Sequence, residues 1–179
     1  MNTPNKLTLA RIFCVPLFVI AYSFPGQTGK YIAAAVFLIA FLTDIADGYI
    51  ARKQGIVTKF GKLADPIADK LMMTAALVML TSSGDLAAYI TIIILSREFL
   101  VSGLRMVISS EGAVLSASWL GKLKTVSQCV AVIMLLVQPL VVFLFGAWML
   151  DVSVYVALVL TIWSGADYFI KNWKGIDFK

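Results

Sequence analysis

The chain is organised as six long apolar stretches separated by short polar or turn-forming segments. The stretches cover residues 7–24, 31–50, 63–83, 86–108, 118–145 and 149–171. Each is close to the ~20 apolar residues that an α-helix needs to span a bilayer. We therefore predict an all-α integral membrane bundle of six transmembrane helices. A short N-terminal interfacial segment, with Asn5 as the N-cap of the first helix, would precede the bundle.

Composition and the absence of repeats favour one membrane domain. Hydrophobic residues make up 60% of the 179 residues, whereas soluble domains average ~45–50%. No internal repeat, linker or low-complexity stretch divides the sequence, so a transporter built from two related halves gains no support. We predict a single domain over residues 1–179.

The net charge of +5 is distributed unevenly along the chain. Basic residues precede the first stretch, lie between the second and third, begin the fifth and end the chain. The opposite side carries Lys30 with Asp85 and Asp151. By the positive-inside rule, both termini are therefore cytoplasmic. The lysines form no basic helix or recognition motif, so we expect membrane lipid and no nucleic acid as a partner.

Four aspartates interrupt the apolar sequence at fixed spacing: Asp44, Asp47, Asp65 and Asp69. A carboxylate at the middle of a membrane helix costs ~2.5–3.5 kcal/mol, so these groups need a membrane face or a cation beside them. Within each pair the spacing of three or four residues places both carboxylates on one helix face. Because a short loop joins the two helices, we expect them to be antiparallel neighbours. The four carboxylates would then surround a space open to the cytoplasm.

The residue types around these aspartates indicate a metal site that binds a phosphorylated ligand. The chain contains no histidine, and oxygen ligands alone select hard cations, so we expect Mg²⁺ or Mn²⁺ and room for two ions. Gly48 and Ala51 remove side chains from the same face, and Arg52 could hold a phosphate. The alternative is that the aspartates merely form ion pairs with Arg52, Lys62 and Lys70.

The whole pattern D-x-x-D-G-x-x-A-R-x₈-G-x-x-x-D-x-x-x-D resembles the motif of the CDP-alcohol phosphotransferases. Its fixed positions are Asp44, Asp47, Gly48, Ala51, Arg52, Gly61, Asp65 and Asp69. The resemblance implies a six-helix membrane fold, usually homodimeric, with divalent metal on the four aspartates and Asp69 as the catalytic base. On this basis we expect the CDP-linked lipid to contact Asn5, Thr8, Arg11, Gly48, Ala51, Arg52 and Gly61.

Three flanking segments look like those of the bacterial phosphatidylglycerophosphate synthases within that family. They are Pro4-Asn5-x-Leu7-Thr8-x-x-Arg11, Ser96-Arg97-Glu98-Phe99 with Gly103-Leu104-Arg105, and Gly121-Lys122-x-Lys124-Thr125-x-x-Gln128. This likeness implies transfer of a phosphatidyl group from CDP-diacylglycerol to glycerol 3-phosphate, with release of CMP. It also favours the bacterial inner membrane, with a cytoplasmic active site, although an organelle membrane stays open.

Four cationic residues are the candidates for binding glycerol 3-phosphate: Arg97, Arg105, Lys122 and Lys124. The two arginines are eight residues apart and therefore share a helix face, whereas the two lysines do not, so we expect only one lysine to point inward. We expect no pairing of Arg97 with Glu98, because neighbouring residues diverge on a helix. The alternative is that both arginines extend to the membrane interface.

Three other functions stay open. The acceptor could be inositol phosphate, serine or a phosphatidyl lipid within the same family. The aspartates could instead form the transport site of a divalent-cation transporter, although Gly48 and Ala51 have no role in that hypothesis. A non-catalytic scaffold would not need all eight motif positions.

Overall fold

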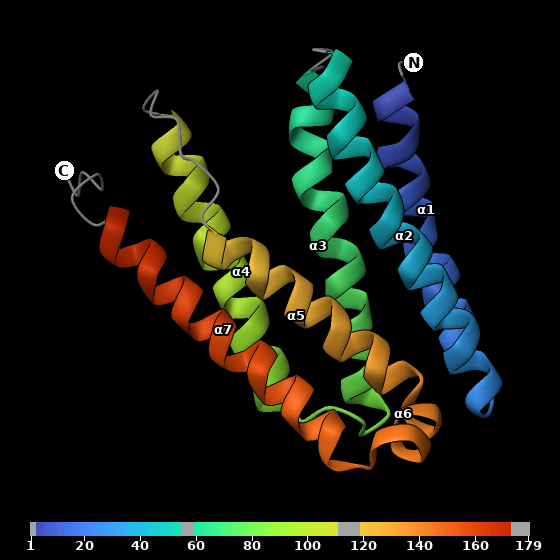
Figure 1. The fold of residues 1–179 in the computed structure, drawn as a ribbon. Coiled ribbons are helices and arrows are strands. Elements are labelled where there is room, and N and C mark those ends of the chain that lie inside the picture. The colour runs from blue at the N-terminus through green and yellow to red at the C-terminus, as the bar shows by residue number, and fades with distance from the viewer. Residues whose placement is uncertain (1–2, 55–58, 111–118, 173–179) are drawn as a thin grey trace. The chain divides into compact units, whose positions relative to one another are not determined.

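The computed structural model describes the backbone of residues 3–54, 59–110 and 119–172, and the side chains of residues 10–43, 70–108 and 119–172. Seven helices and no strand occur in these ranges, so the all-α prediction is confirmed (Figure 1). The helices are α1 (Thr3–Ser23), α2 (Gln27–Gln54), α3 (Lys59–Ser82), α4 (Ala88–Ser110), α5 (Trp119–Leu136), α6 (Gln138–Phe145) and α7 (Trp148–Asn172).

Two details of the predicted helices are wrong. Helix α1 begins at Thr3, so Asn5 lies inside the helix and is not its N-cap. Pro4 fits this first turn because the amide hydrogen that proline lacks would have no helical partner there. The stretch 118–145 is two helices, because Pro139 cannot donate the amide hydrogen bond that would continue α5.

The break between α5 and α6 is itself stabilised. The side-chain amide of Gln27, the first residue of α2, donates a hydrogen bond of 2.8 Å to the carbonyl of Leu136, the last residue of α5. Carbonyls in the last turn of a helix lack helical partners, so this side chain acts as a cap supplied by another helix.

The helices form two compact units. One contains α1, α2, α3 and residues 135–137, and the other contains α4, α6, α7 and the remainder of α5. The prediction of a single domain over residues 1–179 is not tested by this division and stays a prediction.

In the first unit, α1 packs along both α2 and α3 (Figure 1). The rings of Phe18 and Tyr22 on α1 and Phe37 on α2 form an aromatic cluster, with centroids 6.0 and 6.2 Å from Phe18. Ala33, Ala40 and Ala76 are almost completely buried. Small residues at helix contacts allow the backbones to approach closely, which is how apolar helices associate without a hydrophobic driving force.

A polar cluster joins the three helices at the end opposite the α2–α3 connection. One oxygen of Asp85 lies 2.6 Å from Ser83 Oγ and 3.1 Å from the Tyr22 hydroxyl, and the same oxygen forms an ion pair with Lys30. Gly84 holds Asp85 in place: its φ of 79° and the bonds Gly84 N–Thr81 O and Asp85 N–Leu80 O form a Schellman cap on α3.

In the second unit, α7 packs against α4 and α6. Helix α5 joins them through a buried hydrogen bond of 2.8 Å from Gln128 to the Thr161 hydroxyl of α7. That hydroxyl in turn donates to the Ala157 carbonyl one turn earlier, at 2.6 Å. The amide and the hydroxyl therefore satisfy each other inside an otherwise apolar interface.

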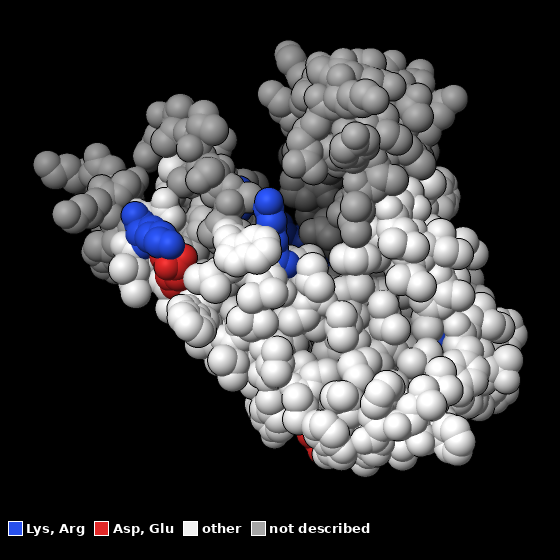
Figure 2. All heavy atoms as spheres, in the orientation of Figure 1, with Lys and Arg blue, Asp and Glu red and all other residues white. Residues whose placement is uncertain are grey.

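Large apolar side chains cover much of the outer surface. Phe143 is 85% exposed, and Ile170, Trp119, Met106 and Ile92 are also largely exposed. On the face drawn in Figure 2, charged side chains of the described residues occur only at a few places. Two described helices, α5 and α7, are long and apolar enough to cross a bilayer, and shorter apolar segments cover Ala10–Ser23, Gln27–Thr43 and Lys70–Ser82. An apolar surface of this extent suits contact with lipid.

We expect Asp85→Asn to lower the thermal midpoint of the protein in detergent at neutral pH. Burial raises the pKa of the Asp85 carboxyl, but hydrogen bonds from Lys30, Ser83 and Tyr22 outweigh burial and leave the pKa below its ordinary value. The carboxylate therefore stabilises the fold fully above about pH 4 and loses this effect as pH falls through the folded-state pKa. The difference in thermal midpoint between wild type and Asp85→Asn should shrink in acid. A difference independent of pH would contradict a stabilising role for the charged Asp85 carboxylate.

Candidate active site

The four aspartates lie on α2 and α3, at the end of the first unit where these helices are connected. Asp47 is seven residues before the end of α2 at Gln54, and Asp65 is six residues after the start of α3 at Lys59. Asp44 and Asp69 are each ten residues from the same helix ends. Because every helical residue advances the chain by about 1.5 Å, the aspartates lie at similar distances from the connected ends of the two helices, in two sets with one aspartate from either helix.

This backbone register suits the predicted metal site, and the donor set is limited to carboxylate oxygens, as hard divalent cations prefer. The side chains of the four aspartates lie outside the described residues, as do those of Asn5, Thr8, Gly48, Ala51, Arg52 and Gly61. Among the side chains that are described, no group of three acidic, histidine or cysteine residues could hold a metal. The ligand and donor-binding roles stay predictions.

Arg11 is the one predicted donor-binding residue whose side chain is described. It lies on α1, which packs against both aspartate-bearing helices, and it is only 3% exposed. A guanidinium buried this deeply requires compensating acceptors. Its burial at this end of the unit therefore agrees with a place beside an acidic site.

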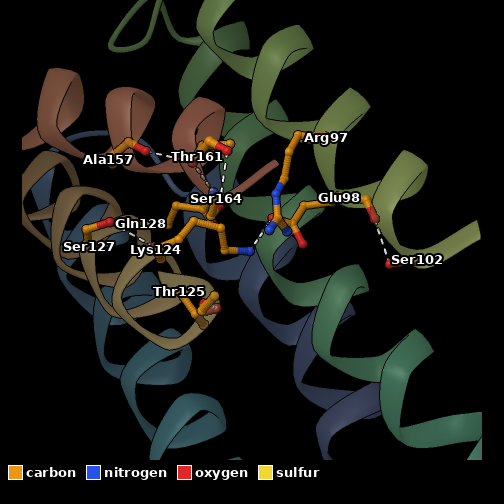
Figure 3. Close-up of polar contacts among 11 residues, drawn as sticks. Arg97, Glu98, Ser102, Lys124, Thr125, Ser127, Gln128, Ala157, Thr161 and Ser164 are labelled. Atoms are coloured by element: carbon orange, nitrogen blue, oxygen red, sulfur yellow. Dashed lines mark hydrogen bonds and ion pairs between the residues drawn. The ribbon is translucent and has the colours of Figure 1, made fainter. Parts of the chain in front are cut away.

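In the second unit, three charged side chains from α4 and α5 meet (Figure 3). One oxygen of Glu98 forms an ion pair with Lys124 and lies 3.5 Å from Nη1 of Arg97. The three side chains are 15%, 6% and 13% exposed, respectively. A single carboxylate thus stabilises two cationic groups that would otherwise be costly to bury.

The expectation that Arg97 would not pair with Glu98 is wrong. Although neighbouring residues leave a helix in different directions, both side chains are long and bend toward the same interior space, where Lys124 enters from α5 (Figure 3). Burial favours this convergence, because a carboxylate in apolar surroundings gains more from each nearby cation than it would in water.

Both arginines of α4 face α7. The stem of Arg97 lies against Gly165, and the guanidinium of Arg105 lies 5.9 Å from the ring centroid of Tyr168. This confirms that the two arginines share a helix face. Arg105 is exposed and therefore accessible to a ligand, and the hydroxyl of buried Tyr168 has no hydrogen-bond partner among the described residues.

The two lysines of α5 differ as predicted. Lys124 is buried and paired with Glu98, whereas Lys122, in the first turn of α5, is exposed. Only one of the two therefore points into the unit. Which of them contacts an acceptor is not tested by this difference.

Sequence reasoning missed three residues of this cluster: the counter-ion Glu98, the packing site Gly165 and the ring of Tyr168. Glu98 carried a usable signal, since an acidic residue inside an apolar stretch needs a partner. Gly165 carried a weaker one, because a glycine in a helix interior has a conformational cost and often marks a close approach.

Comparison with known proteins identifies the family. The sequence profile of the CDP-alcohol phosphatidyltransferases matches residues 1–163. The chain belongs to this family. The match includes both aspartate pairs of α2 and α3 and the cationic residues of α4 and α5.

Several relatives resemble the chain over nearly its whole length. Proteins named CDP-diacylglycerol–glycerol-3-phosphate 3-phosphatidyltransferase are 43% identical in Bacillus subtilis, 40% in Haemophilus influenzae and 37% in Rickettsia bellii. These alignments cover 98%, 93% and 94% of this chain and 97%, 91% and 93% of the respective relatives.

We predict that Glu98→Gln lowers stability far more than Asp167→Asn, a matched removal of one carboxylate charge. Breaking a buried ion pair costs on the order of 3 kcal/mol, whereas an exposed pair contributes about 1 kcal/mol or less. Asp167 pairs with Lys171, which is 65% exposed, at 2.8 Å. Thermal unfolding in one detergent compares the two variants, and equal shifts would contradict a stabilising role for the buried carboxylate.

Proposed function

We propose that the protein transfers the phosphatidyl group of CDP-diacylglycerol to glycerol 3-phosphate and releases CMP, within phosphatidylglycerol and cardiolipin biosynthesis. The observation that carries this proposal is the near full-length similarity, at 37–43% identity, to relatives that bear the name of this activity. The complete eight-position aspartate motif supports a catalytic member of the family over a scaffold.

The donor would bind at the end of the first unit where the aspartates lie. The small residues Gly48 and Ala51 leave room on α2 for the cytidine, while Arg52 and buried Arg11 supply positive charge for the diphosphate. Asn5 and Thr8 lie near the start of α1, and Gly61 lies near the start of α3. These three residues would complete the contacts with the donor. The acyl chains would stay in lipid beside the apolar outer surface.

In our proposal the protein binds two divalent ions, either Mg²⁺ or Mn²⁺. The residues that would hold them are Asp44, Asp47, Asp65 and Asp69. When bound, the metal supplies positive charge that neutralises the diphosphate and the departing CMP. The similar distances of the aspartates from the connected ends of α2 and α3 and their all-oxygen donor set support this assignment.

The acceptor would be held by cationic residues of the second unit. Arg105 of α4 and Lys122 of α5 are exposed. Arg97 lies on the same face of α4 as Arg105 and carries a buried Nε without a partner among the described residues. Lys124 forms an ion pair with Glu98. We therefore propose that Lys122 contacts the acceptor and that Lys124 neutralises the buried Glu98 carboxylate. Guanidinium groups suit a phosphate dianion because they can donate two parallel hydrogen bonds.

Asp69 would act as the general base. Its carboxylate takes the proton of the 1-hydroxyl of glycerol 3-phosphate, and that oxygen forms a bond to the phosphorus on the lipid side of the diphosphate. The bond from this phosphorus to the oxygen of CMP breaks, and CMP leaves with the electron pair. A carboxylate suits this role in a chain without histidine.

We place this reaction at the cytoplasmic face of a bacterial inner membrane, in a homodimer of six-span subunits. The apolar surface, the two long apolar helices and the shorter apolar segments support a multi-pass arrangement. The concentration of basic residues in alternate connections supports cytoplasmic termini.

Release of CMP by the purified protein tests the proposal. With CDP-diacylglycerol in mixed micelles, release should require both glycerol 3-phosphate and Mg²⁺ or Mn²⁺. Release that depends instead on inositol phosphate or serine would replace the proposed acceptor. If sealed vesicles containing the protein take up metal and no acceptor supports CMP release, the transporter hypothesis would stand in its place.

Asp69→Asn tests the base. This variant keeps the size of the side chain but cannot accept the proton, and removal of a general base costs about 10²- to 10⁴-fold in turnover. Because the amide oxygen of asparagine can still coordinate the metal, binding of CDP-diacylglycerol in the presence of metal should change little, which can be followed by thermal stabilisation. Turnover near the wild-type rate would exclude Asp69 as the base.

A further inference from the structure

The direction of the Arg97 side chain is set by residues from three helices. Its own helix, α4, contributes Glu98, whose carboxylate lies 3.5 Å from Arg97 Nη1. Helix α5 contributes Lys124, which forms an ion pair with the same carboxylate oxygen. The third contact is with α7, at a residue without a side chain. Arg97 is therefore a constrained group, unlike a surface arginine with many rotamers.

The contact on α7 is at Gly165. A Cβ atom added there would lie 3.0 Å from Cγ, 3.7 Å from Nε and 4.0 Å from Cδ of Arg97, and these are the three nearest atoms. A separation of 3.0 Å between carbon atoms is well inside their optimal distance of about 3.5–4.0 Å. A methyl group at position 165 would thus require the stem of Arg97 to shift by a few tenths of an ångström.

A shift of the Arg97 stem would matter because its guanidinium still has a hydrogen-bond donor that no described residue of the protein accepts from. Arg97 Nε is buried and has no hydrogen-bond partner among the described residues. Buried donors in native proteins are rarely left without an acceptor, so this guanidinium keeps hydrogen-bonding capacity that the described residues do not use. Arg105, on the same face of α4, lies by Tyr168 one turn of α7 beyond Gly165, so two guanidinium groups lie along one side of α7.

We propose that Gly165 is a positioning residue for the acceptor. Its missing side chain lets Arg97 lie across α7, and Glu98 then orients the guanidinium for the phosphate of the acceptor. This inference rests on the proposed transfer to glycerol 3-phosphate. The contact concerns the phosphate, which is remote from the reacting hydroxyl, so its loss should weaken acceptor binding more than it slows the chemical step.

Gly165→Ala is the decisive variant. We expect the KM for glycerol 3-phosphate to rise about tenfold, since a misplaced charge-assisted hydrogen bond has that order of effect. The KM for CDP-diacylglycerol and kcat should stay within about twofold. The thermal midpoint should change much less than in Glu98→Gln, because the Glu98–Lys124 ion pair remains and alanine is a better helix former than glycine, and this separates positioning from a loss of folding.

A neighbouring residue provides the matched control. Ala166 is exposed on the same turn of α7, so Ala166→Val adds methyl groups to the helix without approaching Arg97. This variant should retain the wild-type KM for glycerol 3-phosphate.

A double-mutant cycle tests whether Gly165 acts through Arg97. Arg97→Ala removes the Cγ that the new methyl group would meet, so Gly165→Ala should have no further effect on kcat/KM for the acceptor in that background. An unchanged KM in Gly165→Ala, or full additivity with Arg97→Ala, would overturn the inference. Wild-type protein that does not use glycerol 3-phosphate would instead overturn the proposed function.

Discussion

Buried charge needs compensation in a protein made almost entirely of apolar helices, and this requirement organises both units. Asp85 ties α1, α2 and α3 together because Lys30, Ser83 and Tyr22 all reach one of its oxygens. Glu98 joins α4 and α5 in the same way, with Lys124 and Arg97 as its partners. Without hydration, an isolated charge of either sign would be far more costly than at a water-exposed surface.

The same requirement distinguishes charged side chains that neutralise each other inside the protein from charged side chains that can bind a ligand. Lys124 and Glu98 compensate each other within the protein, whereas Arg105 and Lys122 are exposed. The aspartates of α2 and α3 are all of one sign, and a cation from outside the chain would compensate them. A divalent metal and an anionic substrate would thus complete the charge balance that the sequence leaves open.

Much of the fold follows from the sequence because its signals are local. Apolar stretches of bilayer length and turns at Gly26, Gly84 and Gly146 mark most helix boundaries to within a few residues. The break at Pro139 does not follow from the apolar pattern, because the apolar run continues on both sides of Gln138-Pro139. The candidate site divides similarly: the aspartate spacing is local and readable, whereas the contacts of Glu98 with Lys124 and of Arg97 with Gly165 join distant positions. Such contacts depend on tertiary packing, which periodicity does not encode.

The most direct test of the account follows the acceptor into the lipid. The assay contains purified protein, CDP-diacylglycerol, Mg²⁺ and ¹³C-labelled glycerol 3-phosphate. It should yield a phospholipid that carries the label and, besides the phosphate of the phosphatidyl group, the phosphate of glycerol 3-phosphate. Mass spectrometry should detect this lipid in an amount equal to the CMP released. CMP formed together with unlabelled phosphatidic acid would indicate hydrolysis of the donor, and would contradict the account of a transferase whose second unit binds glycerol 3-phosphate.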